Sequence, residues 1–449
     1  MSSDLLSIGA SGAKAAKIAL DVTGQNIANA SSDGYIRRTA KTTEVATTGY
    51  QGAVRDVSLS GVRISGVIRN ADAFRQAEVR RTGSDTARAT TEVEGLSNVE
   101  AALENSNVYT AITNFESSLQ KLKEDTTDTS LRASVIEAAR TMTDTFQIAS
   151  TQLDAVGSGL RFNASDGVTQ VNRIAAELGR TNLRLSRAAD ASSDQTALLD
   201  QRDQLLQELS KYADIGTTFA TDGSVAVTLG GGSAPTLVSG GTAYALAMTT
   251  VSNPGQTDDG TITFNIDGAP VALSGGSLSG QQQTLTKLGQ VHGDLNTLAR
   301  DIVTTVNGVQ ATGVDLDGNA GAALLSGTDA ASFALATSNP RALATATSGI
   351  GSRDSSNLDA LRSALVNTNP AGRMDAILFD VSATVSGRTV TRDALKTISD
   401  AASTALSAQS GVDLDTEAVN LVRYQQAFQA SGRVMQVAST LFDTLLNIK

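Results

Sequence analysis

The sequence predicts a mainly α-helical protein with an inserted β domain. Apolar residues recur in steps of three and four at both ends of the chain and through a long central block, which is the spacing of amphipathic helices. Residues 215–283 instead alternate apolar and polar side chains among Gly, Ser and Thr, a pattern typical of strands and hairpin turns. We therefore expect terminal helices that pair as an α-helical coiled coil, a long-helix bundle as the middle domain and a small β module.

The two ends of the chain each carry one apolar stripe. The N-terminal stripe is narrow and rich in alanine, and consists of Leu6, Ala10, Ala13, Ala16, Leu20 and Ile27. The C-terminal stripe is broad and heptad-like, is flanked by Val434, Val437 and Leu441, and consists of Leu421, Tyr424, Phe428, Met435, Ala438, Phe442 and Leu445. A single amphipathic helix is marginal in water. We therefore expect both stripes to be assembly interfaces, against each other and against neighbouring subunits.

Between these ends, a short β element is expected at 40–68, and residues 66–213 are expected to be helical. Glycines at 157, 159 and 167 are expected to interrupt or bend the longest helix, because glycine is unfavourable in a helix interior. Helical spacing returns at 285–302 and 395–406. The inserted strands are expected to fold on a core of their own, made of Val225, Val227, Leu229, Leu237, Leu246, Ile262, Phe264 and Ile266.

These changes between helix-like and strand-like residue patterns predict three domains. The first is an axial domain formed by the terminal helices, residues 1–40 with 411–449. The second is the helical bundle, residues 41–214 with 284–410, which includes the small β element. The third is the inserted β domain at 215–283, expected to project from the bundle with few contacts across its boundary.

Composition excludes several kinds of chemistry. The 449 residues include no Cys and only one His, so no disulfide, thiolate nucleophile or Cys/His zinc site can form. That residue, His292, is expected on a helix surface. The net charge is -11 and no basic run stands out, which argues against nucleic acid as a partner. The sequence shows neither a membrane-spanning stretch nor a cleaved signal, which fits the cytoplasm or export by a route that removes no signal.

Four local patterns resemble catalytic or ligand-binding sites, and each fails on spacing. Asp315 begins a loop like that of a calcium site, but Ala320 replaces the required Gly and Ser326 the bidentate Glu, so a turn is expected. The glycines at 157–159 follow a helix and those at 230–232 lack a Lys partner, so neither forms a phosphate loop. Asp200, Asp203 and Glu208 are expected on a solvated, salt-bridged helix face beside Arg202. No catalytic residue, metal or cofactor is expected.

One constellation directly follows the N-terminal stripe, and its members are Asn26, Asn29, Gly34, Tyr35 and Arg37. Asn29 is expected to cap the helix, Asp33 and Gly34 to form a turn with positive φ, and Tyr35 to anchor the returning chain. These residues match the Asn-x-x-Asn…Gly-Tyr-x-Arg signature at the start of flagellar rod, hook and hook-associated axial proteins, and residues 410–449 resemble the matching C-terminal helix.

Within that superfamily, residues 61–74 and the helix at 198–205 are similar to the hook-associated protein 1 family, the first proteins of the hook-filament junction. The resemblance implies a structural subunit of the bacterial flagellum, not an enzyme, that leaves the cell through the flagellar type III export apparatus. It implies contacts with the hook protein, with a second junction protein or filament subunits, with other copies in a ring, and with an export chaperone. It implies neither nucleic acid nor membrane as a partner.

Three alternatives remain open at this point. A hook or distal-rod subunit would share the terminal helices but lack the long helical block at 71–213. A secreted adhesin or effector with coiled-coil arms would need no matched terminal helices and no Asn-x-x-Asn…Gly-Tyr element. An enzyme would need a pocket with at least one strongly perturbed titratable group.

Overall fold

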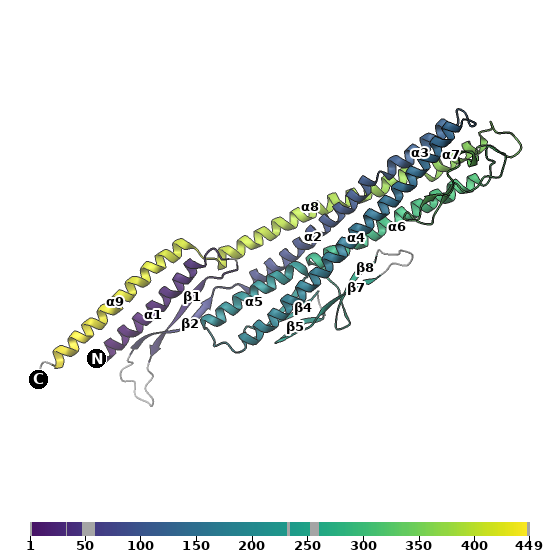
Figure 1. Ribbon diagram of the computed structural model, residues 1–449. Helices are drawn as coiled ribbons and strands as arrows, with labels where there is room; N and C mark the ends of the chain where they lie inside the picture. The colour runs from purple at the N-terminus through teal and green to yellow at the C-terminus, as the bar shows by residue number, and fades with distance from the viewer. Residues whose placement is uncertain (1, 33, 47–58, 231–233, 252–259, 447–449) are drawn as a thin grey trace. The chain divides into compact units, whose positions relative to one another are not determined.

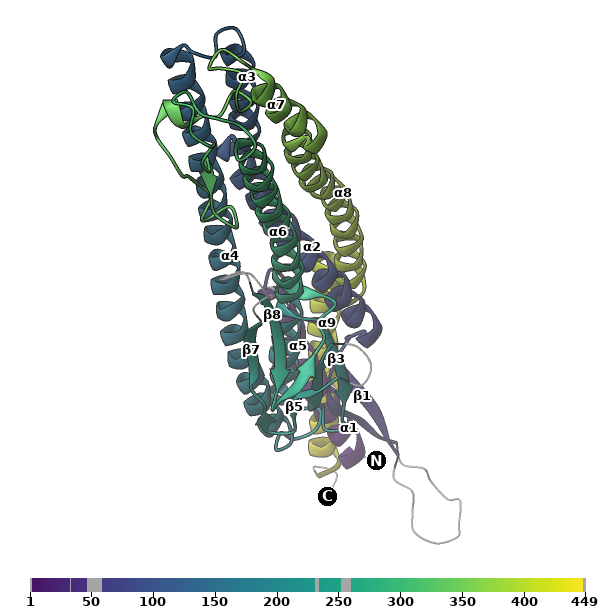
Figure 2. The same cartoon turned by 90° about the vertical axis from the view of Figure 1, so that its right-hand side faces the viewer.

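The computed structural model describes residues 2–32, 34–46, 59–230, 234–251 and 260–446 (Figures 1 and 2). Its contacts divide the chain into two compact units. Unit 1 contains residues 1–84, 171–245 and 396–449, and unit 2 contains residues 85–170 and 246–395. This grouping differs from the three-domain division expected from the sequence, which remains a prediction. Long helices dominate both units, and the mainly α class with inserted strands is confirmed.

Unit 1 contains the two ends of the chain. Helix α1 (Ser2–Ala28) is followed by the antiparallel hairpin of β1 (Arg38–Ala46) and β2 (Leu59–Arg69), in which Arg38 faces Arg69. Helices α5 (Ser193–Tyr212) and α9 (Leu414–Leu446) belong wholly to this unit. The start of α2 (Ala73–Ser106), the end of α4 (Thr129–Leu185) and the end of α8 (Pro370–Ser410) complete its helices.

The remaining strands of unit 1 form one antiparallel sheet in the order β3-β4-β5-β6. Its strands are β3 (Ile215–Phe219), β4 (Val225–Leu229), β5 (Thr236–Ser239) and β6 (Thr242–Ala243). Helix α4 contacts this sheet directly, because the Asn182 amide bonds the backbone of Val225 in both directions and also reaches the Gly240 carbonyl at 2.8 Å. The loop between β3 and β4 is held from α5, where Arg202 donates to the Gly223 carbonyl at 2.6 Å.

Unit 2 is a helical bundle with a second small sheet. Its helices are α3 (Val108–Leu122), α6 (Gly276–Gln310), α7 (Ser356–Thr368), the short η1 (Pro340–Ala342) and parts of α2, α4 and α8. Strands β7 (Leu246–Val251), β8 (Thr261–Ile266) and β9 (Ala269–Val271) pair antiparallel, and α6 holds β8 through the Gln282 amide, 2.7 Å from the Ile262 carbonyl. Two short strands, β10 (Leu325–Ser326) and β11 (Ala334–Leu335), also pair.

The inserted strands do not share a single core. All eight residues of their predicted core are buried, but they lie in two separate sheets that belong to different units. Each sheet packs on helices of its own unit and exchanges hydrogen bonds with them. The expectation that the strands project from the bundle on a core of their own is therefore wrong.

Helix α4 also corrects the sequence analysis, because it continues without interruption through Gly157, Gly159 and Gly167. Gly157 lies where α6 comes close, since a Cβ built there would stand 3.0 Å from the Leu288 side chain. Close helix packing therefore explains this glycine. Figure 2 shows α4 and α6 running side by side.

Candidate assembly interface

Helices α1 and α9 pack along one another in unit 1 (Figure 1). Their close approach depends on small residues. A Cβ added to Gly9 would stand 2.7 Å from the Met435 side chain and 3.2 Å from the Ser431 carbonyl, and one added to Gly12 would stand 2.8 Å from the Ser431 hydroxyl. Ala438, from the α9 side of this contact, is only 1% exposed. The paired terminal helices expected from the sequence are therefore present within one chain.

The predicted interface residues divide into two groups in this pair. Ala16 and Ala438 are buried, and Ala13, Leu20, Leu421, Tyr424 and Met435 are half-buried. Leu6, Ala10, Ile27, Phe428 and Phe442 stay exposed, and the side chain of Leu445 lies outside the described residues. Pairing of α1 with α9 therefore leaves about half of the predicted stripes uncovered. Their role in assembly stays a prediction.

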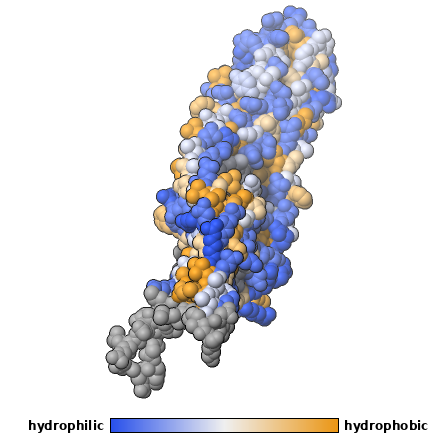
Figure 3. Space-filling model, turned by 90° about the vertical axis from the view of Figure 1, so that its left-hand side faces the viewer, coloured by the Kyte–Doolittle hydropathy of each residue, from blue (hydrophilic) through white to orange (hydrophobic). Residues whose placement is uncertain are grey.

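A second apolar stripe runs along α9, beside its seam with α1. We call it the outer stripe of α9, and it consists of Val419, Val422, Val434, Val437 and Leu441, between 39% and 69% exposed. At 100° per residue, Val434, Leu441 and Val437 lie about 40°, 60° and 100° from Ala438 in the same direction, so they flank the seam with α1. Hydrophobic side chains also form patches between hydrophilic areas on the face of the molecule in Figure 3.

The signature that follows α1 forms a compact turn. Asn26 is 1% exposed, and its amide bonds the backbone of Arg38 in both directions, at 2.9 and 3.0 Å. The Tyr35 hydroxyl donates to the same Asn26 oxygen at 2.9 Å. The Asn29 side chain donates back to the Gln25 carbonyl, and Gly34 has a φ of 74°. The Asn29 contact, the positive φ of Gly34 and the tyrosine anchor agree with the expectation, and Asp33 lies outside the described residues.

Arg37 connects this turn to the C-terminal helix. Its Nε lies 2.7 Å from Glu417 Oε1, and Glu417, in the first turn of α9, is 1% exposed. The Arg37 backbone amide also donates to the Ser410 carbonyl at the end of α8. A carboxylate near a helix N-terminus interacts favourably with the helix dipole, so Glu417 suits its position as well as its partner. The signature therefore fixes where α9 begins relative to α1.

Next to the signature lies a buried ion-pair cluster, which we define as Arg38, Arg69, Asp200, Arg202 and Asp203. Asp200 accepts from Arg38 at 2.7 Å and from Arg69 at 2.8 Å. Asp203 accepts from Arg69 and Arg202 at 2.7 Å each, and from the Gln76 amide at 3.0 Å. Both carboxylates are 8% exposed. The expectation that they lie on a solvated helix face is therefore wrong.

The cluster joins the β1-β2 hairpin to α5, and its charges are mutually dependent. Burial alone would raise the pKa of Asp203, but Arg202 and Arg69 outweigh that effect and hold the pKa below its ordinary value. Sequence reasoning missed Arg38 and Arg69 because they reach α5 from strands more than a hundred residues away. The sequence did contain one sign that these carboxylates are buried, because both aspartates lie beside the leucines of the apolar face of α5.

The single histidine is also buried, at 7% exposed, so the expected surface position is wrong. His292 Nε2 lies 2.9 Å from the Ser150 hydroxyl, and Nδ1 lies 3.8 Å from Asp154. The order of groups is that of a hydrolase triad, but Ser150 is 1% exposed inside the α4-α6 contact. A substrate cannot reach that hydroxyl, so this arrangement serves packing. Burial lowers the pKa of His292 despite Asp154 and Asp329.

The other candidate patterns also occupy structural positions. Asp315 Oδ1 accepts the backbone amides of Asp317 and Asn319, which makes the expected turn. The described ranges contain no cluster of three or more metal-ligating side chains. Among the described helices, none is long and apolar enough to cross a membrane.

The paired ends define the class of protein. Residues 6–35 match the model of the flagella basal body rod proteins, and residues 403–448 match that of the flagellar basal body rod FlgEFG protein C-terminal region. Both describe axial proteins of the flagellum. Residues 94–325, more than half of the chain, match the model of the flagellar hook-associated protein FlgK helical domain. The chain therefore belongs to the FlgK family of flagellar hook-associated proteins.

Two curated relatives agree with this assignment. The chain is 30% identical over 332 residues to flagellar hook-associated protein 1 of Salmonella typhimurium, a match that covers 71% of this chain but only 58% of that relative. It is 28% identical to flagellar hook-associated protein 1 of Escherichia coli over the full length of both. A solved structure of the flagellar hook junction protein FlgK from Burkholderia pseudomallei is 25% identical, covers 56% of this chain and 46% of that chain, and superposes with a TM-score of 0.49.

Proposed function

We propose that this chain is a structural subunit of the bacterial flagellum that joins the hook to the filament. The observation that carries the proposal is the pair α1 and α9, which covers part of the predicted stripes and leaves apolar side chains exposed, including the outer stripe of α9. An exposed apolar stripe on a helix indicates a surface that another protein covers. Membership of the hook-associated family indicates that the covering proteins are other axial subunits.

In this proposal the subunit acts as an adaptor and not as an enzyme. Its terminal helices pack with those of other copies in a ring, and the rest of the chain contacts the hook protein on one side and a second junction protein or filament subunits on the other. The subunit reaches this position through the flagellar type III export apparatus. Before assembly, an export chaperone binds it. The extracellular flagellum, at the hook-filament junction, is its place of action.

Variants of α9 test the assembly role. Val437→Asp and Phe442→Asp place a carboxylate on exposed apolar positions, so the monomer should fold normally, whereas burying that charge against a neighbouring subunit costs several kcal/mol. We expect an unchanged thermal melt of the purified chain and loss of filaments in cells. Gln436→Asp is the matched control, since Gln436 is exposed on the polar part of the same helix. Normal filaments with both apolar variants would refute the proposed interface.

A further inference from the structure

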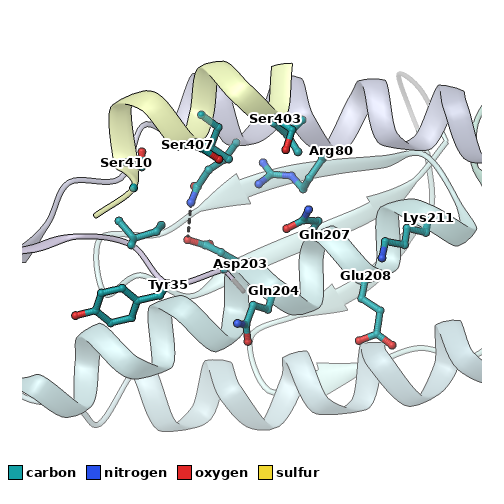
Figure 4. Close-up of a pocket in the computed structure, with 16 residues that line it drawn as sticks. Tyr35, Arg80, Asp203, Gln204, Gln207, Glu208, Lys211, Ser403, Ser407 and Ser410 are labelled. Carbon is teal, nitrogen blue, oxygen red and sulfur yellow. Dashed lines mark hydrogen bonds between the residues drawn. The ribbon is translucent and has the colours of Figure 1, made fainter. Parts of the chain in front are cut away.

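Unit 1 contains a cavity of about 580 Å³ (Figure 4). Helix α2 contributes one wall with Gln76 and Arg80, and α5 contributes the second wall with Asp203, Gln207 and Lys211. The third wall is the last turns of α8, and it carries the hydroxyls of Ser403, Ser407 and Ser410. Polar groups of three helices and a cation on each of two walls therefore converge on one space.

Arg80 is the distinctive group of this cavity. Its side chain points into the space between the helices, as Figure 4 shows, and the residue is only 6% exposed. Asp203 attracts it, but that carboxylate has no acceptor position left, because Oδ1 accepts twice from Arg202 and Oδ2 accepts from Arg69 and Gln76. Among the described residues, Arg80 forms neither a hydrogen bond nor an ion pair within 4.0 Å.

The charges around Arg80 do not balance. With Arg80 included, the buried ion-pair cluster holds four guanidinium groups, of Arg38, Arg69, Arg80 and Arg202, against the two carboxylates of Asp200 and Asp203. Excess buried charge is unfavourable unless it is neutralised. Burial lowers the pKa of Arg80, and Arg202 adds to that effect. In the cluster itself, Arg38 Nε is buried without a hydrogen-bond partner in the described part of the chain.

The other lining groups also favour a hydrogen-bond acceptor as the ligand of this cavity. The Ser410 hydroxyl is buried and has no hydrogen-bond partner within the described ranges. Among the described lining residues, Glu208 is the only further carboxylate, and it is paired with Arg173 at 2.7 Å. An anion with several oxygens is the type of ligand that guanidinium, ammonium and hydroxyl donors bind together.

We propose that this cavity binds a small oxyanion, of the phosphate or carboxylate type, with Arg80 as its principal ligand and Ser410, Gln207 and Lys211 as further donors. The anion would be either a free solute or the carboxylate of an acidic side chain from another protein. Bound anion would neutralise part of the excess charge and lock α2, α5 and the end of α8 together. This inference does not depend on the junction role.

Calorimetric titration of the purified full-length chain with inorganic phosphate, at constant ionic strength set by chloride, tests the proposal. We expect saturable binding that Arg80→Gln weakens at least tenfold. Arg180→Gln, which removes an exposed arginine of α4 whose partner Glu177 does not line the cavity, should leave the affinity unchanged. A second titration with acetate separates the sources, since binding of acetate supports a protein carboxylate and binding of phosphate alone supports a free solute. Absence of binding for both anions would overturn the proposal.

Gln207→Glu gives an independent test in which Arg80 is kept. Gln207 and Arg80 point toward one another across the cavity in Figure 4, so the isosteric glutamate supplies the missing carboxylate from within the chain. We expect this variant to melt at a higher temperature than the wild type in chloride and to lose its response to phosphate. An unchanged melting temperature together with an unchanged phosphate affinity would show that Arg80 needs no anion.

Discussion

At the scale of single residues, the buried ion-pair cluster is the strongest determinant of how the β1-β2 hairpin attaches to α5. Asp203 accepts four hydrogen bonds. Replacing its carboxylate would remove a negative charge that neutralises the buried guanidinium groups of Arg69 and Arg202. Loss of one partner of a buried ion pair is more destabilising than its formation is stabilising. Stability should therefore depend on this aspartate far more than on any surface charge.

Asp203→Asn should lower the free energy of unfolding by about 3–5 kcal/mol, the usual effect of breaking a buried pair. Glu208→Gln on the same helix is the matched control, because its pair with Arg173 is exposed on both sides and such pairs contribute about 0–1 kcal/mol. Urea denaturation of the two variants and the wild type measures the difference. Equal stabilities for both variants would show that the cluster does not fix the hairpin.

His292 makes stability depend on pH. Because burial lowers its pKa in the folded chain, the unfolded chain binds more protons once the pH falls below the ordinary histidine value of about 6.5. Stability contributed by the neutral imidazole is therefore complete above that pH and is lost as the pH falls. We expect the free energy of unfolding to decrease more steeply between about pH 7 and pH 5 in the wild type than in His292→Gln. Parallel curves would contradict this sign.

At the scale of elements, the α1-α9 pair shows why glycine occupies particular positions. Both Gly9 and Gly24 lie inside α1, but a Cβ at Gly9 meets Met435 and the backbone of Ser431, whereas a Cβ at Gly24 meets nothing within 4 Å. Alanine increases helix propensity at both positions by about 1 kcal/mol. The difference between the two substitutions therefore isolates the contact with α9.

Gly24→Ala should raise the melting temperature of the terminal helices, and Gly9→Ala should lower it or leave it unchanged, because Met435 and the α9 backbone must move. Circular dichroism at 222 nm (about the helix minimum) during heating follows both variants. Equal stabilisation by the two alanines would mean that α1 and α9 are not in close contact in solution.

The sequence predicted these helices well and the strands only in part. Steps of three and four residues identified α1, α4, α6 and α9, because a helix with one buried face must repeat its apolar residues in this way. The same pattern could have found the buried histidine, since His292 lies four residues after Leu288 on the inner face of α6. The sequence could not show which strands pair or which helices each sheet packs on. Apolar and polar residues alternate along the strands in the same way whether they form two sheets or one module.

The site was also predicted in part. The Asn26, Tyr35 and Gly34 turn follows from local chain geometry, and its hydrogen bonds span no more than about a dozen residues. Contacts such as Arg37 with Glu417 and Arg69 with Asp203 join residues distant in sequence, so no local pattern contains them. Exposure of Phe428 and Phe442 likewise depends on which side of α9 meets α1.

At the scale of the whole molecule, both ends of the chain match models of flagellar basal body rod proteins, and the region between them matches the FlgK helical domain. The paired ends leave an apolar stripe exposed. In the role that we propose, other subunits cover that stripe and complete the packing of the chain. The role that we propose for it is a position in the flagellum between two other structures, where the loss of one subunit type stops further growth.

Electron microscopy of cells that lack this chain tests that role most directly. We expect finished hooks without filaments, and we expect filaments to return when the wild-type chain is supplied. The Gln436→Asp chain should restore them equally well, and the Val437→Asp chain should not. Filaments of normal length in cells without the chain would contradict the junction role, and absent hooks would place the subunit earlier in the axial structure.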